Sequence, residues 1–291
     1  MIIGCSGGQD FARKLAQHLS ETYSSLTVSH FPDGEMLVRL MNDVKGKRVV
    51  LVQRFFGDVS NQILEVMFAA HALRDLGAKK VVLVAPYMPY MRQDTRFHSG
   101  EVVSQRAFAQ LCDSFFDVVV TVDPHLHRIR SLPAVFSCQS VVISSDTALS
   151  TFIKKKYRDV VILGPDLESY QWAERVASLL QVPFRVLEKK RHSSRRVTVT
   201  LNEPYNFSGK TVVLIDDIVS TGHTLLEAVT LVKKFKPQKI IAVVVHGLFV
   251  EDALHKLQKA GVTVFATNTL VTDVSRIDVS LLVAEKLKKR R

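Results

Sequence analysis

The sequence predicts an α/β protein that contains two similar domains in tandem. Residues 46–54 and 209–217 share one pattern, in which a Gly-Lys pair and one further residue precede four consecutive apolar residues. A helical pattern rich in Leu and Ala follows each copy and leads to a second apolar strand, at residues 81–84 and 240–243. Strands that alternate with helices form parallel sheets with right-handed crossovers. Each domain should therefore contain a mainly parallel sheet flanked by helices.

The length of the chain fits this division. Its 291 residues exceed one typical domain and match two domains of ordinary size. We expect an N-terminal domain over residues 1–140 and a C-terminal domain over residues 141–291, whose last helix is able to pack back on the first domain.

Composition and charge limit the classes of function. The formal net charge of +11 favours polyanionic partners, which include nucleic acid, a membrane surface and small phosphorylated substrates. Cys5, Cys112 and Cys138 are widely spaced, which indicates neither a disulfide framework nor a zinc site. No apolar run reaches the length of about 18 residues that a membrane helix needs, and the first residues lack a signal-peptide pattern. We expect a soluble cytoplasmic protein without a membrane partner.

The segment after the second Gly-Lys copy carries the strongest functional signal. An apolar strand is predicted to end at Ile215, and a strand-to-helix turn follows with two carboxylates and small hydroxylated residues, namely Asp216, Asp217, Ser220, Thr221, Gly222 and Thr224. Ligands of open α/β sheets bind at the carboxyl ends of strands, and a helix N-terminus favours phosphate. The carboxylates suit sugar hydroxyls or a divalent metal ion, so the pattern indicates a phosphorylated sugar. Simple capping of the helix by Asp is the alternative.

The first copy lacks this combination. Its corresponding positions begin with Gln53 and Arg54 and continue with two Phe residues. We therefore expect only the second domain to bind a sugar phosphate.

Two loops of the first domain suggest a nucleotide. Phe31 could stack on a purine while Asp33 and Glu35 accept hydrogen bonds, although an ordinary turn is an alternative. The loop 86–96 offers the guanidinium groups of Arg92 and Arg96 to phosphate or carboxylate oxygens, and a solvated surface loop is its alternative.

Together these segments resemble the ribose-phosphate pyrophosphokinases, and the resemblance covers nearly the whole chain. The loop 216–224 alone also resembles type I phosphoribosyltransferases, so the fold implied is two tandem phosphoribosyltransferase-like domains. The implied reaction is Mg²⁺-dependent transfer of the diphosphoryl group of ATP to O1 of ribose 5-phosphate, which gives phosphoribosyl pyrophosphate and AMP.

The resemblance also implies roles for individual residues. Phe31, Asp33 and Glu35 would contact adenine in a neighbouring subunit's site, which requires a homo-oligomer, either a dimer or a hexamer. Arg92, Gln93 and Asp94 would hold the nucleotide. The 216–224 residues named above would bind ribose 5-phosphate.

Two further strand ends gain roles from the resemblance. His125 follows the apolar strand 118–122 and would be a catalytic residue that ligates the magnesium of ATP, although such a His is more often structural. Asp166 follows the strand 160–164 and would contact metal and ribose. The continuation 167–172 departs from the small residues usual in the family and adds the negative charge of Glu168.

The basic segment 189–196 has three interpretations. Its five fixed positive charges are typical of a nucleic-acid or targeting patch, or of a solvated loop. The resemblance instead implies a mobile loop that closes over the transferred group, with Lys189 and Arg191 as catalytic cations. The basic C-terminus is assigned no function, since it suits the end of a helix.

Three alternative functions remain: a phosphoribosyltransferase that consumes the activated sugar, a non-catalytic regulatory relative, and a basic nucleic-acid binder. The first leaves the Phe31 and Arg92 segments unexplained, and the second is disfavoured by the intact segments 189–191 and 216–224. We expect no nucleic-acid partner, because no known binding module is present.

Overall fold

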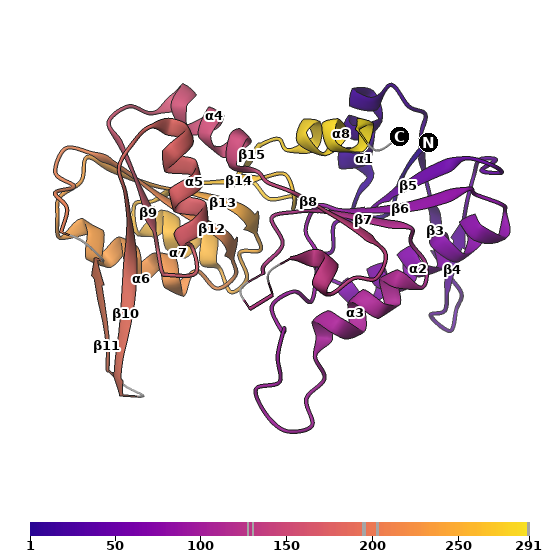
Figure 1. The fold of residues 1–291 in the computed structure, drawn as a ribbon, viewed down its shortest axis with the longest axis horizontal. Coiled ribbons are helices and arrows are strands. Elements are labelled where there is room, and N and C mark those ends of the chain that lie inside the picture. Colours follow the sequence, from indigo (N-terminus) through magenta and orange to yellow (C-terminus); the bar gives the residue numbers. More distant parts are fainter. Residues whose placement is uncertain (127, 130, 194–195, 202–203, 290–291) are drawn as a thin grey trace. The chain divides into compact units, whose positions relative to one another are not determined.

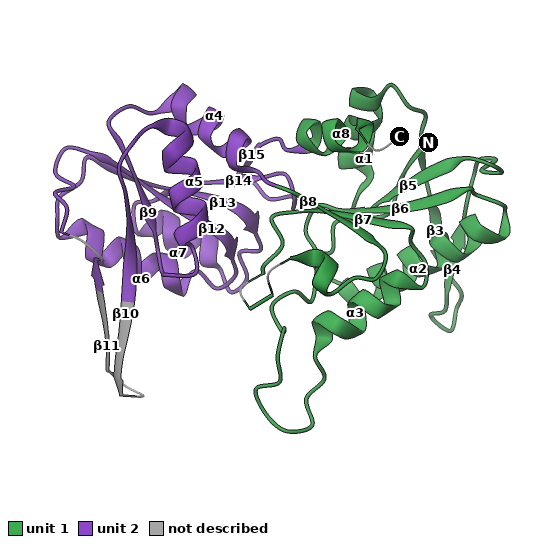
Figure 2. Cartoon of the chain, viewed as in Figure 1, with its two compact units in different colours: residues 1–143, 280–291 green, residues 144–279 purple. Residues whose placement is uncertain are grey.

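The structure is a computed structural model that describes residues 1–126, 128–129, 131–193, 196–201 and 204–289, with the backbone alone at 189–193 and 196–199. The chain divides into two compact units. Unit 1 consists of residues 1–143 and 280–291, and unit 2 of residues 144–279 (Figure 2). Each unit is an α/β domain with a mainly parallel sheet, so the predicted fold class is confirmed.

Unit 1 is organised around a six-stranded sheet with the order β2-β1-β5-β6-β7-β8, in which every neighbouring pair is parallel. A separate antiparallel hairpin pairs β3 with β4. The strands are β1 (Ile2–Gly4), β2 (Tyr23–Ser25), β3 (Thr27–His30), β4 (Met36–Arg39), β5 (Arg48–Val52), β6 (Lys80–Ala85), β7 (Val118–Val122) and β8 (Gln139–Ile143). The helices are α1 (Gln9–Leu19), α2 (Val59–Asp75), α3 (Ser104–Asp113), the 3₁₀ helix η1 (Leu132–Ala134) and α8 (Ser280–Lys288).

The central strands of unit 1 are continuous apolar runs because helices cover them. Leu51, Leu83 and Val119 are inaccessible to solvent and pack in one core cluster with Phe108 of α3. Such runs are typical of parallel strands that are buried on both faces. The C-terminal helix α8 also belongs to unit 1, where it packs against α1 and β8 (Figure 1).

Unit 2 has a seven-stranded sheet with the order β11-β10-β9-β12-β13-β14-β15. Only the β10–β11 pair is antiparallel. The strands are β9 (Val160–Gly164), β10 (Phe184–Ser193), β11 (Arg196–Leu201), β12 (Thr211–Val219), β13 (Lys239–Gly247), β14 (Thr263–Thr267) and β15 (Ser275–Ile277). The helices are α4 (Asp146–Lys156), α5 (Tyr170–Leu180), α6 (His223–Lys233) and α7 (Ala253–Lys259).

The strand order reverses once in each sheet, and this position predicts where a ligand binds. In unit 2 the chain runs outward from β9 to β10 on one side and from β12 to β13 on the other. The loops after β9 and β12 therefore diverge and leave a crevice, which is the usual ligand site of open α/β sheets. In unit 1 the corresponding position lies between β1 and β5.

Over the described residues, no helix of either unit combines the length and the apolar composition that a membrane span requires.

Candidate active site

Asp216 and Asp217 lie inside β12, which corrects the predicted end of this strand at Ile215. The sequence placed Asp216 and Asp217 in the turn, but β12 continues to Val219. Pairing with β13 sustains the strand, since Asp216 stands opposite Val244 and Ile218 opposite His246. The turn is consequently short and spans only residues 220–222 before α6 begins.

Three carboxylates converge at the reversal point of unit 2. Asp216 accepts the backbone N–H of Asp217 at 3.0 Å, and Asp217 accepts that of Ile218 at 2.8 Å. Burial raises the pKa of Asp216 well above its ordinary value, and the negative charges of Asp217 and Asp166 raise it further. Asp166, two residues beyond β9, is therefore close enough to act on β12 electrostatically.

The turn after β12 forms a cradle at the N-terminus of α6. Gly222 is the N-cap residue, with a φ of 75°, and its carbonyl accepts the N–H of Leu226 at 3.0 Å. Glycine suits this position because other residues rarely adopt a positive φ, and because an added Cβ would lie only 3.2 Å from the Cβ of Ala253. Ser220, Thr221 and Thr224 are partly exposed around it. The helix dipole and its first N–H groups favour an anion here.

Sequence reasoning missed the segment that supports this cradle. The N–H groups of Leu248 and Phe249 both donate to the carbonyl of Val219 at 3.0 Å. Phe249, Glu251 and Asp252 all have positive φ angles, so the chain turns tightly between β13 and α7. The available signal was the interruption of the apolar run 240–250 by His246 and Gly247.

The segment after β9 is a hydrogen-bonded turn. Asp166 and Ser169 share three hydrogen bonds that involve a side chain, and Ser169 is buried as the N-cap residue of α5. Leu167 and Tyr170 are exposed on either side. The departure of 167–172 from the family pattern is thus accommodated by a stable local structure around Asp166.

The basic segment 189–196 differs from the loop that the sequence predicted. Lys189 and Arg191 lie in β10, where their backbone pairs with Val199 and Val197 of β11. The two strands extend beyond the rest of the unit 2 sheet (Figure 1). The side chains of Lys189 and Arg191, and residues 194 and 195, lie outside the described part of the structure.

The crevice at the reversal point of unit 1 is filled by the chain itself. Arg54 is 4% exposed, donates from Nε to the Gly7 carbonyl at 2.9 Å and forms an ion pair with Asp10. Burial lowers the pKa of Arg54 to about 10. A Cβ on Gly8 would collide with the carbonyl oxygen of Val52, which shows how closely the loop after β1 packs on β5.

The same crevice contains a buried acidic residue that the sequence did not single out. Glu65 of α2 accepts the N–H of Ser6 at 2.7 Å and also the Ser6 hydroxyl. Gln53 accepts the N–H of Gly7 at 2.9 Å. These contacts give the physical reason for expecting no sugar-phosphate cradle in the first copy.

The segment 31–35 lies at an exposed hairpin tip in unit 1. Phe31, which is 49% exposed, closes the turn between β3 and β4 by donating its N–H to the Glu35 carbonyl at 2.8 Å. Asp33 accepts the N–H of Glu35 at 3.1 Å, and Gly34 has a φ of 93°. The ring and both carboxylates are therefore presented to solvent.

The segment 92–94 follows β6 and has three different environments. Arg92 is exposed. Gln93 accepts a hydrogen bond from the Ser104 hydroxyl. Asp94 has a side chain only 5% exposed, and its Oδ1 lies 2.8 Å from Nη1 of Arg128. Sequence reasoning missed Arg128, because nothing in its local pattern separates it from other surface arginines.

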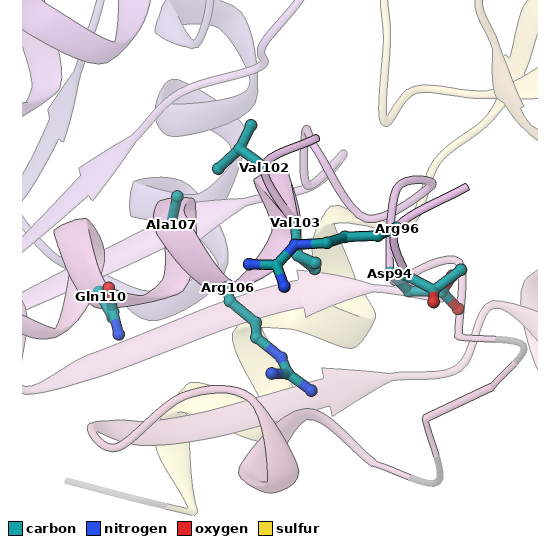
Figure 3. Close-up of a pocket in the computed structure, with 8 residues that line it drawn as sticks. Asp94, Arg96, Val102, Val103, Arg106, Ala107 and Gln110 are labelled. Carbon is teal, nitrogen blue, oxygen red and sulfur yellow. The ribbon is translucent and has the colours of Figure 1, made fainter. Parts of the chain in front are cut away.

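A pocket of about 430 Å³ opens beside Asp94 (Figure 3). Its lining residues are Asp94, Thr95, Arg96, Val102, Val103, Arg106, Ala107 and Gln110. Arg96 and Arg106 both line it, and Figure 3 shows the Arg96 side chain reaching toward the helix that carries Arg106. The sequence named Arg96 but not Arg106, which occupies an ordinary helical position on α3.

His125 lies in the loop that follows β7. Asp123 leaves the strand with a φ of 32°, is 5% exposed, and donates its N–H to the Ile143 carbonyl at 3.0 Å. Asp123 thus fixes the direction in which the chain leaves β7, and His125 follows it in a partly buried position.

Across the described residues, no three His, Cys, Asp or Glu side chains are arranged to hold a metal ion by themselves. Mg²⁺ sites usually combine one or two carboxylates with water and substrate phosphates. Asp216, Asp217 and Asp166, whose negative charges repel one another, could supply the carboxylate oxygens of such a site.

Comparison with known proteins adds independent information. Residues 1–115 match the family model for the N-terminal domain of ribose phosphate pyrophosphokinase, and residues 140–277 match the phosphoribosyl transferase domain. A ribose-phosphate pyrophosphokinase of Methanothermobacter thermautotrophicus is 36% identical over 290 residues, covering 99% of this chain and 100% of the relative. One from Saccharolobus solfataricus is 31% identical over 293 residues, with coverage of 99% and 100%.

A solved structure matches the same family over the whole chain. The crystal structure of phosphoribosylpyrophosphate synthetase from Mycobacterium smegmatis matches 100% of this chain and 98% of its own, with a TM-score of 0.88 and 25% sequence identity. Because the relatives align from end to end, the chain belongs to the ribose-phosphate pyrophosphokinase family.

Proposed function

We propose that this enzyme transfers the diphosphoryl group of ATP to O1 of ribose 5-phosphate, which yields phosphoribosyl pyrophosphate and AMP. The observation that supports this most strongly is the meeting of Asp166 and the β12 carboxylates with the α6 cradle at the reversal point of unit 2. An anion site next to hydrogen-bond acceptors matches the two ends of a sugar phosphate.

Unit 2 supplies the residues for ribose 5-phosphate. Ser220, Thr221, Gly222 and Thr224 hold the 5-phosphate through hydroxyl groups and backbone N–H groups. Asp216 and Asp217 accept hydrogen bonds from the ribose hydroxyls, and Asp166 contacts the ribose and the metal. Acceptor carboxylates beside a phosphate cradle suit a ligand that carries both hydroxyl and phosphate groups.

Unit 1 supplies the residues for ATP. Arg92, Gln93 and Asp94 form the nucleotide segment after β6, and Phe31, Asp33 and Glu35 contact adenine from the hairpin tip. The hairpin tip exposes an aromatic ring and two acceptor carboxylates, which suits the site of another subunit. We therefore propose a homo-oligomer, and a fully active monomer in analytical ultracentrifugation would contradict this role for the hairpin.

Mg²⁺ is the proposed metal ion, with His125 and Asp166 as its protein ligands. When bound, it neutralises phosphate charge during phosphoryl transfer. Lys189 and Arg191 of β10 supply further positive charge to the transferred group, and the strands that carry them extend away from the rest of the sheet. Preorganised cations of this kind are the main protein contribution to phosphoryl transfer. The reaction is proposed to take place in the cytoplasm.

Phosphorus NMR of the purified protein with ribose 5-phosphate, ATP and Mg²⁺ tests the reaction. We expect AMP and a new pyrophosphate ester to appear in equal amounts. Formation of ADP would instead show transfer of a single phosphoryl group. Ribose 5-phosphate binding without any product would favour a regulatory relative, the alternative suggested by the unusual 167–172 segment.

A further inference from the structure

The ion pair between Asp94 and Arg128 connects two loops of unit 1 at the proposed nucleotide segment. Asp94 lies two residues after Arg92, and Arg128 lies three residues after His125. Their charged atoms are 2.8 Å apart, and the Asp94 side chain is 5% exposed whereas that of Arg128 is 59% exposed. The Arg128 guanidinium also lies 5.7 Å from the centroid of the Phe97 ring. One side chain thus contacts both ends of the segment 94–97.

The charge of Asp94 matters because of the pocket that it borders. Arg96 donates from Nε to the backbone carbonyl of Glu101 at 2.8 Å. The Glu101 carboxylate is occupied by the N–H groups of Phe97 and His98, at 2.8 and 3.1 Å. Over the described residues, neither Arg96 nor Arg106 forms an ion pair with a carboxylate. Asp94 is therefore the acidic group among the residues that line the pocket.

A buried carboxylate without a cationic partner is costly, and it seeks a new partner or water. Without Arg128, Asp94 would still share its pocket with the cations Arg96 and Arg106. Their charge would then be cancelled by the protein and be unavailable to an anionic ligand.

We propose that Arg128 is a positioning residue for the nucleotide: it neutralises Asp94, so that Arg96 and Arg106 remain available to the phosphates of ATP. This role rests on the proposed function. It makes Asp94 the carboxylate through which Arg128 acts on ATP binding, and it adds Arg106 to the groups that face the nucleotide. Figure 3 shows the guanidinium groups of both arginines on the same side of Asp94.

A double-mutant cycle tests the proposal. ATP affinity is measured by equilibrium titration with Mg²⁺ and without ribose 5-phosphate, so this measurement does not depend on catalysis. We expect Arg128→Gln to weaken ATP binding by about tenfold, because Asp94 becomes an uncompensated buried charge. The double variant Asp94→Asn with Arg128→Gln should bind ATP more tightly than Arg128→Gln alone, because the competing carboxylate is gone. The KM for ribose 5-phosphate should change by less than about twofold in both.

Two further variants separate charge from folding. Arg128→Lys keeps the charge and should bind ATP more tightly than Arg128→Gln. Arg74→Gln is the matched control. Arg74 also forms an ion pair in unit 1, with Asp117 at 2.9 Å, but Asp117 precedes β7, whereas Arg128 follows it. That variant should leave ATP affinity unchanged.

Two results would overturn the proposal. ATP affinity in Arg128→Gln equal to that of the wild type would show that Arg128 has no such role. Failure of the double variant to recover would show that Arg128 contacts the nucleotide itself and does not act through Asp94. If the wild type produced no AMP and pyrophosphate ester, the proposed reaction would fail, and the ATP titration would still decide the role of Arg128.

Discussion

Asp166 and Ser169 exchange hydrogen bonds in both directions across one turn. The Ser169 N–H donates to Oδ1 of Asp166 at 3.1 Å, and the Ser169 hydroxyl donates to the Asp166 carbonyl at 2.6 Å. The Asp166 N–H in turn approaches the Ser169 hydroxyl oxygen at 3.2 Å. Gly164 leaves room for this arrangement, because a Cβ there would lie 2.7 Å from the Ser169 hydroxyl oxygen. The carboxylate of Asp166 is therefore held in one orientation.

The Asp166–Ser169 turn predicts the effect of removing the Ser169 hydroxyl. Ser169→Ala should lower kcat by about tenfold, since a loss of about 1.4 kcal/mol in positioning energy corresponds to that factor. Steady-state assays that follow AMP would measure it. Ser178→Ala, an exposed serine on the same helix, should have wild-type activity. Equal loss in both variants would contradict a role for the turn.

Gly222 should be irreplaceable for sugar-phosphate binding. Gly222→Ala places a Cβ against Ala253 at a φ of 75°, which distorts the cradle and should raise the KM for ribose 5-phosphate by about tenfold or more. Gly209→Ala is the control, because Gly209 has a φ of 69° but open space around it. Both variants should lose about 1 kcal/mol of stability in urea unfolding. A similar rise of KM in Gly209→Ala would show that strain alone accounts for the effect.

Lys189 should contribute to the chemical step rather than to folding. Lys189→Ala is expected to lower kcat by about a hundredfold, as for other preorganised charge stabilisers. Rapid-quench measurement of AMP formation would detect it, and Lys233→Ala, on the exposed last turn of α6, provides the control. A normal rate in Lys189→Ala would remove the cationic contribution from β10.

Arg54 should stabilise unit 1 without affecting sugar-phosphate binding. Arg54→Gln removes the buried partner of Asp10 and should cost about 2 kcal/mol in the free energy of unfolding, because the hydrogen bond to Gly7 is lost as well. Urea unfolding would measure this cost. The KM for ribose 5-phosphate should stay within about twofold of the wild type, which corresponds to a change of less than about 0.4 kcal/mol in binding free energy. A large rise in that KM would mean that the first copy takes part in sugar-phosphate binding.

Asp113 should give unit 1 a pH-dependent contribution to stability. Burial acts to raise the pKa of Asp113, but hydrogen bonds from the Cys138 and Ser137 N–H groups, both at 2.9 Å, outweigh it and lower the pKa below its ordinary value. The stabilisation is therefore complete above the unfolded pKa of about 4 and disappears as the pH falls through the lower folded pKa. Wild type and Asp113→Asn should differ by about 1 kcal/mol at pH 7, and the difference should vanish in acid. Urea unfolding at several pH values measures it, and a difference that is constant with pH would contradict the prediction.

The sequence alone determined the fold class and the location of the strongest motif. The repeated Gly-Lys strand pattern predicted two βαβ units, and both exist as β5-α2-β6 and β12-α6-β13. The small residues 220–222 predicted a tight turn before a helix, and this turn precedes α6. These predictions succeeded because apolar period, glycine conformation and turn chemistry are local properties of the chain.

Only the tertiary structure decided which distant residues meet. The length of β12 depends on pairing with β13, which carried Asp216 and Asp217 into the strand against the local pattern. The segment 189–193 is a strand because β11 supplies its hydrogen-bond partners. The Arg54–Asp10 pair, and the neutralisation of Asp94 by Arg128, join residues that no local pattern relates. Long-range hydrogen bonds and charge pairs are fixed by strand order and burial, and a single sequence does not display either of them.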